Sequence, residues 1–183
     1  MMKTGYAMGL MLGGMIVLSG VAAADDEPYW RRGKGADVAP VRDARYAKEC
    51  GSCHFAYQPG LLPARSWQKL MGSLADHFGD NAELSQEDAA AITDYLVKNA
   101  ADRSNYRRSV KIDDSLSARQ TPLRITQVPY IAGKHREIPA RLIAGNPKVK
   151  SLSQCAACHT QAETGSFREG DINIPGYGRW EDD

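Results

Sequence analysis

Apolar side chains recur at helical spacing in the stretch that runs from Ser66 to Gly79. The repeating positions are Trp67, Leu70, Met71, Leu74, His77 and Phe78. Steps of three and four residues place side chains on one face of an α-helix. Ser66 is a favoured N-cap residue, and Gly79 is a favoured residue just beyond a helix end. The pattern therefore predicts one helix between these two residues, with His77 on its apolar face.

Two further helices are predicted on either side of this one. Pro40 can open a short helix over 41–49, because proline suits the first turn of a helix. Ser85 is a favoured N-cap for a helix over 85–100, where apolar residues again line one side. Together the three helices form a small helical unit in the first half of the chain.

The second half of the chain has no comparable periodicity. Residues 102–121 are polar and charged, which is typical of a linker or of a segment that wraps around a domain. Residues 122–183 contain many Pro and Gly residues and little regular apolar repeat. We therefore predict a mainly α fold, with a helical N-terminal domain over 25–101 and a loop-rich C-terminal domain over 122–183.

The first residues have the pattern of a secretory signal peptide. Lys3 supplies a positive charge, an apolar run covers 5–18, and Ala22–Ala24 offers a small-residue cleavage site. The apolar run is short for a membrane span of about 20 residues, which disfavours the alternative of an uncleaved anchor. Residues 1–24 are therefore predicted to be removed on export to the periplasm, with Asp25 as the new N-terminus.

Charge is balanced over the whole chain, with 23 basic and 22 acidic residues. This balance argues against the strongly basic composition typical of nucleic-acid binding. Along the chain the charge is uneven: 101–150 holds eleven Lys or Arg against four Asp or Glu, and 151–183 holds two against six. The basic stretch is either an ordinary solvated surface or a docking face for an acidic partner.

The four cysteines occur in two copies of one motif: Cys50-Gly-Ser-Cys53-His54 and Cys155-Ala-Ala-Cys158-His159. Two disulfides, redox dithiols or a shared zinc site would use the thiols but would leave both histidines unexplained. C-x-x-C-H is the attachment motif of a c-type haem. In one helical turn, residues i, i+3 and i+4 share a face, so both sulfurs can bond to the haem edge while the histidine binds the iron. The sequence therefore predicts two covalently bound c-type haems.

The histidine count equals the number of axial positions on two haem irons. His54 and His159 follow the cysteines as proximal ligands, which leaves His77 and His135 for the two sixth positions. Met71 is the one methionine outside the predicted signal peptide, and it is the alternative sixth ligand. Proximity along the chain favours His77 opposite His54 and His135 opposite His159, with crossed pairing as the alternative.

Two segments near these histidines have the composition of loops. His135 lies between Pro129 and Pro139, which favours a rigid loop over a long helix. Residues 59–63 are rich in Pro and Gly. The loop they form is either a simple turn or a segment that places a backbone carbonyl against a proximal imidazole.

Four stretches of the chain resemble the dihaem cytochrome c family of bacterial periplasms. They read CGSCHFAYQPGLLPARSWQKLMGSLADHFGDNAELS, YIAGKHREIP, CAACHTQAETGSF and IPGYGRW. The resemblance extends from about Tyr46 to Trp180. Its haem motifs are shared by many cytochromes, whereas the segment around Trp67 and His77 is more specific.

The resemblance implies a class I cytochrome c-like N-terminal haem domain and a less regular C-terminal haem domain. It also implies iron atoms with two histidine ligands each, and a role in donating electrons to other haem proteins. One such partner is an oxygen-binding monohaem cytochrome, and a membrane cytochrome b lies upstream.

The expected function is that of a soluble periplasmic electron carrier without enzymatic activity. Bis-histidine ligation lacks the methionine that raises the reduction potential of cytochrome c, so both haems should have low potentials. The alternatives are the electron-entry subunit of a periplasmic reductase and a dihaem peroxidase. A peroxidase requires one iron with an open position, which the histidine count does not provide.

Overall fold

The computed structural model describes residues 1–2 and 35–180. The predicted cleavage site at Ala22–Ala24, and all of the signal peptide beyond Met2, lie outside these residues. Within the described residues, no helix has both the length and the apolar character that a membrane span requires.

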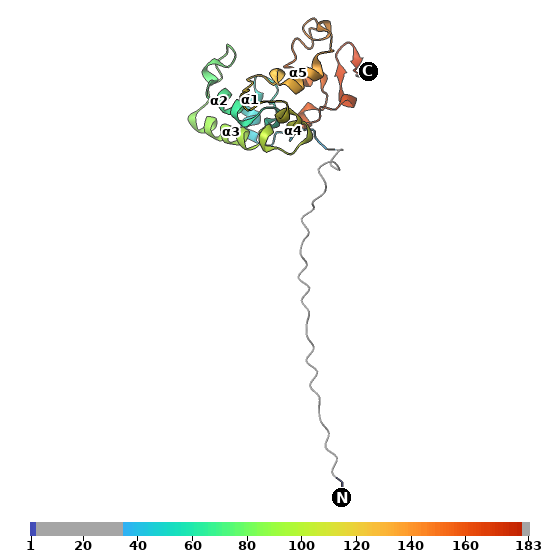
Figure 1. Ribbon diagram of the computed structural model, residues 1–183. Helices are drawn as coiled ribbons and strands as arrows, with labels where there is room; N and C mark the ends of the chain where they lie inside the picture. The colour runs from blue at the N-terminus through green and yellow to red at the C-terminus, as the bar shows by residue number, and fades with distance from the viewer. Residues whose placement is uncertain (3–34, 181–183) are drawn as a thin grey trace.

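The chain forms six α-helices, several 3-10 turns and one short hairpin in the part that the structure describes. Figure 1 shows α1 to α4 gathered at one side of the molecule, with α5 beside them and the chain after α5 at the other side. The helices are α1 (Ala44–Gly51), α2 (Ala64–Met71), α3 (Gln86–Lys98), α4 (Arg107–Asp114), α5 (Pro129–His135) and α6 (Cys155–Cys158). Strands β1 (Asn173–Ile174) and β2 (Gly178–Arg179) pair antiparallel near the C-terminus. The fold is mainly helical, as predicted.

Helix α1 begins later than the sequence pattern predicts. Its N-cap is Asp43, whose side chain accepts a hydrogen bond of 2.8 Å from the backbone N–H of Tyr46. The Tyr46 side chain is buried, and its hydroxyl donates to the carbonyl of Tyr57 at 2.6 Å. This bond holds the first turn of α1 against the loop that follows the first cysteine motif.

The prediction of one helix from Ser66 to Gly79 is wrong at both ends. Helix α2 begins at Ala64, after Pro63, and its first N–H donates to Asp102 Oδ1 at 2.7 Å. Ser66 is fully buried inside the helix and does not cap it. Gly72 ends α2, because glycine is unfavourable in a helix interior.

His77 therefore lies beyond the helix, in a tight turn. A 3-10 turn at Leu74–Asp76 precedes it, and the backbone of His77 pairs with that of Asp80. Phe78 has a positive φ of 61°, which is unusual for a bulky residue. The apolar repeat was correct about the shared face, since Trp67, Leu70 and His77 all line the same cavity.

Helix α3 agrees with its prediction. Ser85 is the N-cap, and its Oγ accepts a hydrogen bond of 3.1 Å from the Asp88 N–H. Ile92 and Leu96 are buried on the side that packs against α2. The cap and the apolar side are both local patterns, so the sequence alone was sufficient here.

The segment 102–121 is more ordered than a linker. It contains α4, and Ser109 and Ile112 of this helix are fully buried. Helix α4 packs beneath the turn at Pro59–Leu61, where a side chain on Gly60 would collide with Ser109 Oγ. The alternative interpretation, a segment that wraps around the first helices, describes it better.

His135 was predicted in a loop, and it instead ends a short helix. Pro129 occupies the first turn of α5, where its missing N–H leaves no helix bond unmade. Ile131 is buried on the inner side of α5. Proline thus starts this helix, and the next proline stands after its end.

Contacts between distant parts of the chain hold the two halves together. The backbone N–H groups of Asp37 and Val38 donate to the Gly165 carbonyl at 2.8 and 3.1 Å. The fully buried Gln58 donates from Nε2 to the Ala162 carbonyl at 2.6 Å. One buried core includes residues from Val38 to Phe167, and the boundaries of the two proposed domains stay a prediction.

Candidate functional site

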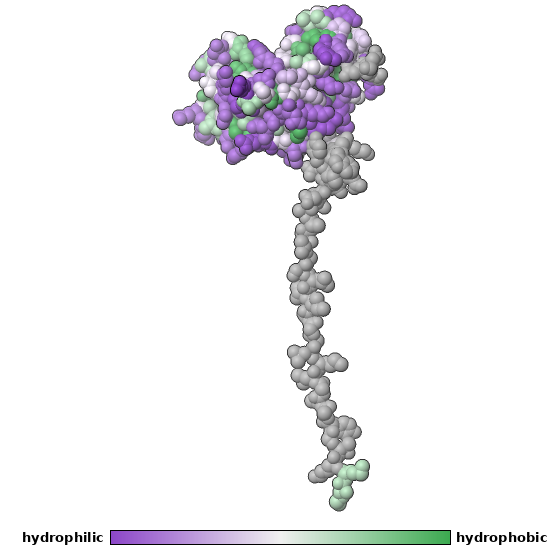
Figure 2. Space-filling view, viewed as in Figure 1, coloured by the Kyte–Doolittle hydropathy of each residue, from purple (hydrophilic) through white to green (hydrophobic). Residues whose placement is uncertain are grey.

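All the site residues that the sequence predicted line one cavity of about 1340 Å³. They are Cys50, Cys53, His54, His77, His135, Cys155, Cys158 and His159. The cavity lies between the helical half and the loop-rich half, and apolar side chains from both halves line it. Figure 2 shows apolar residues, in green, at the surface among hydrophilic ones, both at the left and at the upper right of the folded part. Such a space suits large, mostly apolar ligands.

The first cysteine motif lies at the end of α1. Cys50 is in the last turn of the helix, whereas Cys53 and His54 follow it. The His54 ring faces the His77 ring, with 6.2 Å between ring centroids and 17° between ring planes. The structure therefore brings together the two histidines that chain proximity had paired.

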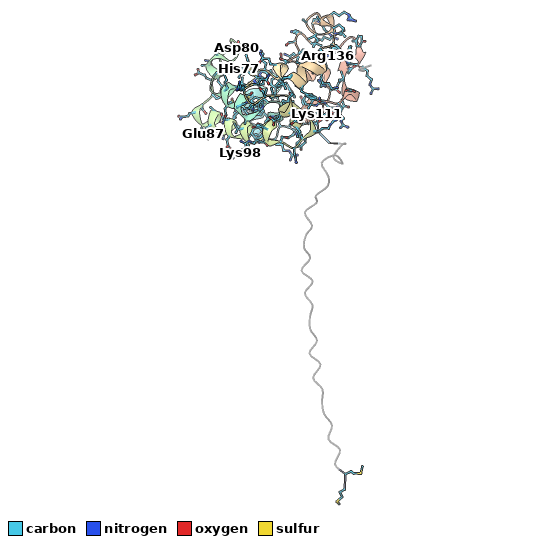
Figure 3. The ribbon with its side chains drawn as sticks, in the orientation of Figure 1. His77, Asp80, Glu87, Lys98, Lys111 and Arg136 are labelled. Carbon is cyan, nitrogen blue, oxygen red and sulfur yellow. The ribbon has the colours of Figure 1, made fainter. Side chains whose placement is uncertain are left out.

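A backbone carbonyl fixes the His54 ring of this first pair, and a backbone pairing holds the turn that carries His77. His54 Nδ1 lies 2.8 Å from the Phe55 carbonyl, which can only accept, so Nδ1 carries the proton and Nε2 keeps its lone pair. The carbonyl that contacts the proximal imidazole of His54 therefore belongs to Phe55, and not to the loop at 59–63 as one of the two sequence interpretations had it. The Pro59 carbonyl instead accepts from Trp67 Nε1 at 2.8 Å. At His77, the backbone N–H donates to the Asp80 carbonyl at 2.7 Å, and Figure 3 shows the two residues side by side.

The second motif forms α6 itself, and His159 follows as its C-cap. The His159 ring lies 6.0 Å from the His135 ring, and the ring planes are 72° apart. His135 Nδ1 lies 2.8 Å from the Ile131 carbonyl one turn earlier in α5. The histidine of each motif therefore faces the distal histidine nearer to it along the chain, and the alternative of crossed pairing is not what the structure shows.

One histidine of each pair, His77 and His159, has a lowered pKa, which favours the neutral imidazole that binds metals. Burial, the neighbouring His135 and the cation of Arg108 lower the pKa of His159 to about 4. Burial and the neighbouring His54 also lower the pKa of His77. Neutral rings with a free nitrogen lone pair are therefore present at both sites around neutral pH.

The cysteines are free thiols in the structure. Burial raises the pKa of both Cys50 and Cys155 to about 11. A redox dithiol requires the opposite shift, towards an easily ionised thiol. Among the described residues, no group of three or more His, Cys, Asp or Glu side chains is placed to hold a metal ion alone.

The residues present fit two haems. Two metal–nitrogen bonds of about 2.1 Å each and the radii of two imidazole rings account for the observed centroid separations. His159 Nδ1 is buried without a hydrogen-bond partner among the described residues, so no backbone carbonyl there sets its tautomer as at His54 and His135. Met71 also lines the cavity, from α2, but the ring that faces His54 is His77.

Sequence reasoning missed three side chains at the site. The Tyr57 ring lies 5.1 Å from the His54 ring, and its hydroxyl donates to the Ser153 carbonyl at 2.7 Å, beside the second motif. The Phe167 ring lies 5.2 Å from the His159 ring. Arg108 of α4 also lines the cavity. No motif marks these residues, because only the fold brings them to the histidines.

Comparisons with known proteins agree with this geometry. The family model described as dihaem cytochrome c matches residues 46–167. A solved diheme cytochrome type c from Shewanella baltica OS155 is 43% identical, with a TM-score of 0.63, covering 75% of this chain and 97% of that one. A diheme cytochrome c from Rhodobacter sphaeroides is 44% identical, with a TM-score of 0.63, covering 71% of this chain and 100% of that one. A search among curated proteins found no match.

The match covers both cysteine motifs and the histidine that faces each of them. The two motifs provide attachment for two c-type haems, as the sequence predicted. Family, motifs and fold therefore lead to one conclusion: the chain belongs to the dihaem cytochrome c family.

Proposed function

We propose that the protein is a low-potential electron carrier in which two histidines bind each haem iron. His54 and His77 bind the first iron, and His159 and His135 bind the second. The observation that carries this proposal is the facing of imidazoles in both pairs, at 6.2 and 6.0 Å. Without an axial thioether, the reduction potentials fall below those of methionine-ligated cytochromes c.

In electron transfer, the residues of this chain bind the haems, orient the histidines that hold them and shield both haems from water. When bound, the haems supply one-electron chemistry at iron. The carbonyls of Phe55 and Ile131 set the tautomer and orientation of His54 and His135. Because the residues of both sites line one cavity, they would hold two haems near one another for electron exchange. With two histidines on each iron, no position would remain for a substrate.

We also propose that the protein is exported to the periplasm, where it donates electrons to other redox proteins. Partners proposed from the family resemblance are an oxygen-binding monohaem cytochrome downstream and a membrane cytochrome b upstream. The side chains of Arg124, Arg141, Lys148 and Lys150 are exposed, and Arg124 and Lys150 also line the haem cavity. This supports docking of a partner with an acidic face near the haems.

The absorbance spectrum of the purified holoprotein tests the proposal. The oxidised protein should lack the far-red charge-transfer band of an iron–methionine bond, and the reduced protein should not bind carbon monoxide. A far-red band would contradict the proposal and point to Met71. Carbon monoxide binding would show an open iron and favour a peroxidase.

A further inference from the structure

Arg108 is a mostly buried cation in the wall of the haem cavity. Its side chain is 14% exposed and lines the same cavity as the histidines. It comes from α4, and the labelled Lys111 marks the next turn of that helix in Figure 3. Burying a guanidinium is costly unless hydrogen bonds and an opposite charge compensate it. The surroundings of Arg108 therefore indicate what it binds.

Only part of its hydrogen-bonding capacity is used by the protein. Nη2 donates to the Phe167 carbonyl at 2.8 Å, and Nη1 donates to the Tyr130 hydroxyl at 3.2 Å. Nε is buried and has no hydrogen-bond partner among the described residues. A buried N–H without an acceptor is costly, so the contacts made by the protein alone do not satisfy this guanidinium.

The charge around Arg108 is also incomplete. Asp37 is 3.5 Å from Arg108 Nη2 and 3.2 Å from Arg107 Nη2, so one carboxylate faces two guanidinium groups. The same carboxylate accepts the Phe167 N–H at 2.9 Å. Among the described residues, two guanidinium groups thus share one carboxylate, so the mostly buried charge of Arg108 is only partly compensated.

The position of Arg108 relates it to the second haem. Its Cζ lies 5.9 Å from the centre of the Phe167 ring, which itself lies 5.2 Å from the His159 ring. Haem carries two propionate carboxylates, and a carboxylate is the acceptor that a guanidinium pairs with best. An anion in this cavity next to His159 would compensate the remaining positive charge of Arg108.

We propose that the guanidinium of Arg108 pairs with a propionate of the haem attached at Cys155 and Cys158, and that its charge raises the reduction potential of this haem. The proposal rests on the proposed function. Ferric haem carries one more positive charge than ferrous haem, so a nearby cation disfavours the ferric state. Arg108 is thus a positioning and tuning residue for the second haem.

A redox titration of the holoprotein, followed by EPR, tests the proposal with four variants. Arg108→Gln should lower the midpoint potential of the second haem and leave the first unchanged. Arg107→Gln is the matched control, because it removes the same charge from the same carboxylate, at a side chain that is 59% exposed; its shift should be much smaller. Arg108→Lys keeps the charge and should retain most of the potential. His135→Met assigns which potential belongs to the second haem.

Resonance Raman spectra separate a direct propionate bond from a structural effect. The propionate bending band should move in both Arg108→Gln and Arg108→Lys, and stay in place in Arg107→Gln. If Arg108→Gln fails to assemble, Arg108→Lys provides the same Raman test. An unmoved band, equal potential shifts in the Arg107 and Arg108 variants, or a shift confined to the first haem would overturn the proposal. Such a result would overturn only the role of Arg108. Two low-spin EPR signals in the unsubstituted protein would still support ligation of each iron by two histidines.

Discussion

Single imidazoles decide how the two haem sites differ. The rings of His54 and His77 are nearly parallel, whereas those of His135 and His159 are nearly perpendicular. The relative orientation of axial imidazoles sets how far the d orbitals of a ferric iron are split. Parallel rings split them strongly, and perpendicular rings leave them close in energy. The two irons should therefore be distinguishable, although the ligands proposed for them are chemically identical.

EPR of the oxidised holoprotein checks this expectation. We expect one rhombic low-spin signal, from the first haem, and one strongly anisotropic signal with a single dominant low-field feature, from the second. His135→Met should replace the anisotropic signal alone, and His77→Met the rhombic signal alone. The potential of the altered haem should rise in each case, since a thioether favours ferrous iron. A histidine whose replacement changes neither signal is not an iron ligand.

At the scale of helices, caps were predictable where they are local and not where a distant residue makes them. Ser85 caps α3 from within the same turn, and the sequence pattern identified it correctly. At α2, Asp102 accepts the N–H of Ala64 from 38 residues away. Ser66 had the right chemistry for an N-cap, but it lies inside the helix, where its Oγ is buried without a hydrogen-bond partner in the described part of the chain.

Two serine-to-alanine substitutions distinguish these roles. Ser85→Ala removes a cap and should lower the free energy of unfolding by about 1 kcal/mol. Ser66→Ala removes a buried hydroxyl that has no hydrogen-bond partner among the described residues, so stability should stay the same or rise slightly. Denaturant unfolding of the holoprotein measures both. A loss for Ser66→Ala as large as that for Ser85→Ala would mean that Ser66 has a partner or a cap role after all.

At the scale of the whole molecule, contacts between the helical half and the loop-rich half hold the fold together. Gly165 has a φ of 79°, and its carbonyl accepts from both Asp37 and Val38. A Cβ at this position would also collide with the Val38 carbonyl. Glycine is thus required here both by the backbone conformation and by the close approach of the N-terminal segment.

Gly165→Ala should therefore destabilise the holoprotein by at least about 1 kcal/mol and lower its melting temperature. Gly170→Ala is a suitable control, because nothing lies within 4 Å of a Cβ there and its φ is not positive. Thermal unfolding followed at the haem absorbance compares the two. Equal melting temperatures for the two variants would contradict the role given to Gly165.

The covalent attachment sites could be predicted from the sequence because their chemistry is local. Two sulfurs and an imidazole must fall within five consecutive residues, so Cys50 to His54 and Cys155 to His159 reveal two haems without any knowledge of the fold. The count of histidines, and the helical character of the first half, could likewise be inferred from residue type and spacing.

Only the tertiary structure decided which groups meet across long stretches of chain. The turn that carries His77, the helix that ends at His135 and the burial of Arg108 all depend on packing between elements. Helix α4 looked like a linker because it has few apolar residues, yet its small Ser109 and buried Ile112 fit under a glycine turn. Residue spacing specifies faces of one element, whereas contacts between elements depend on shape and burial that no local pattern contains.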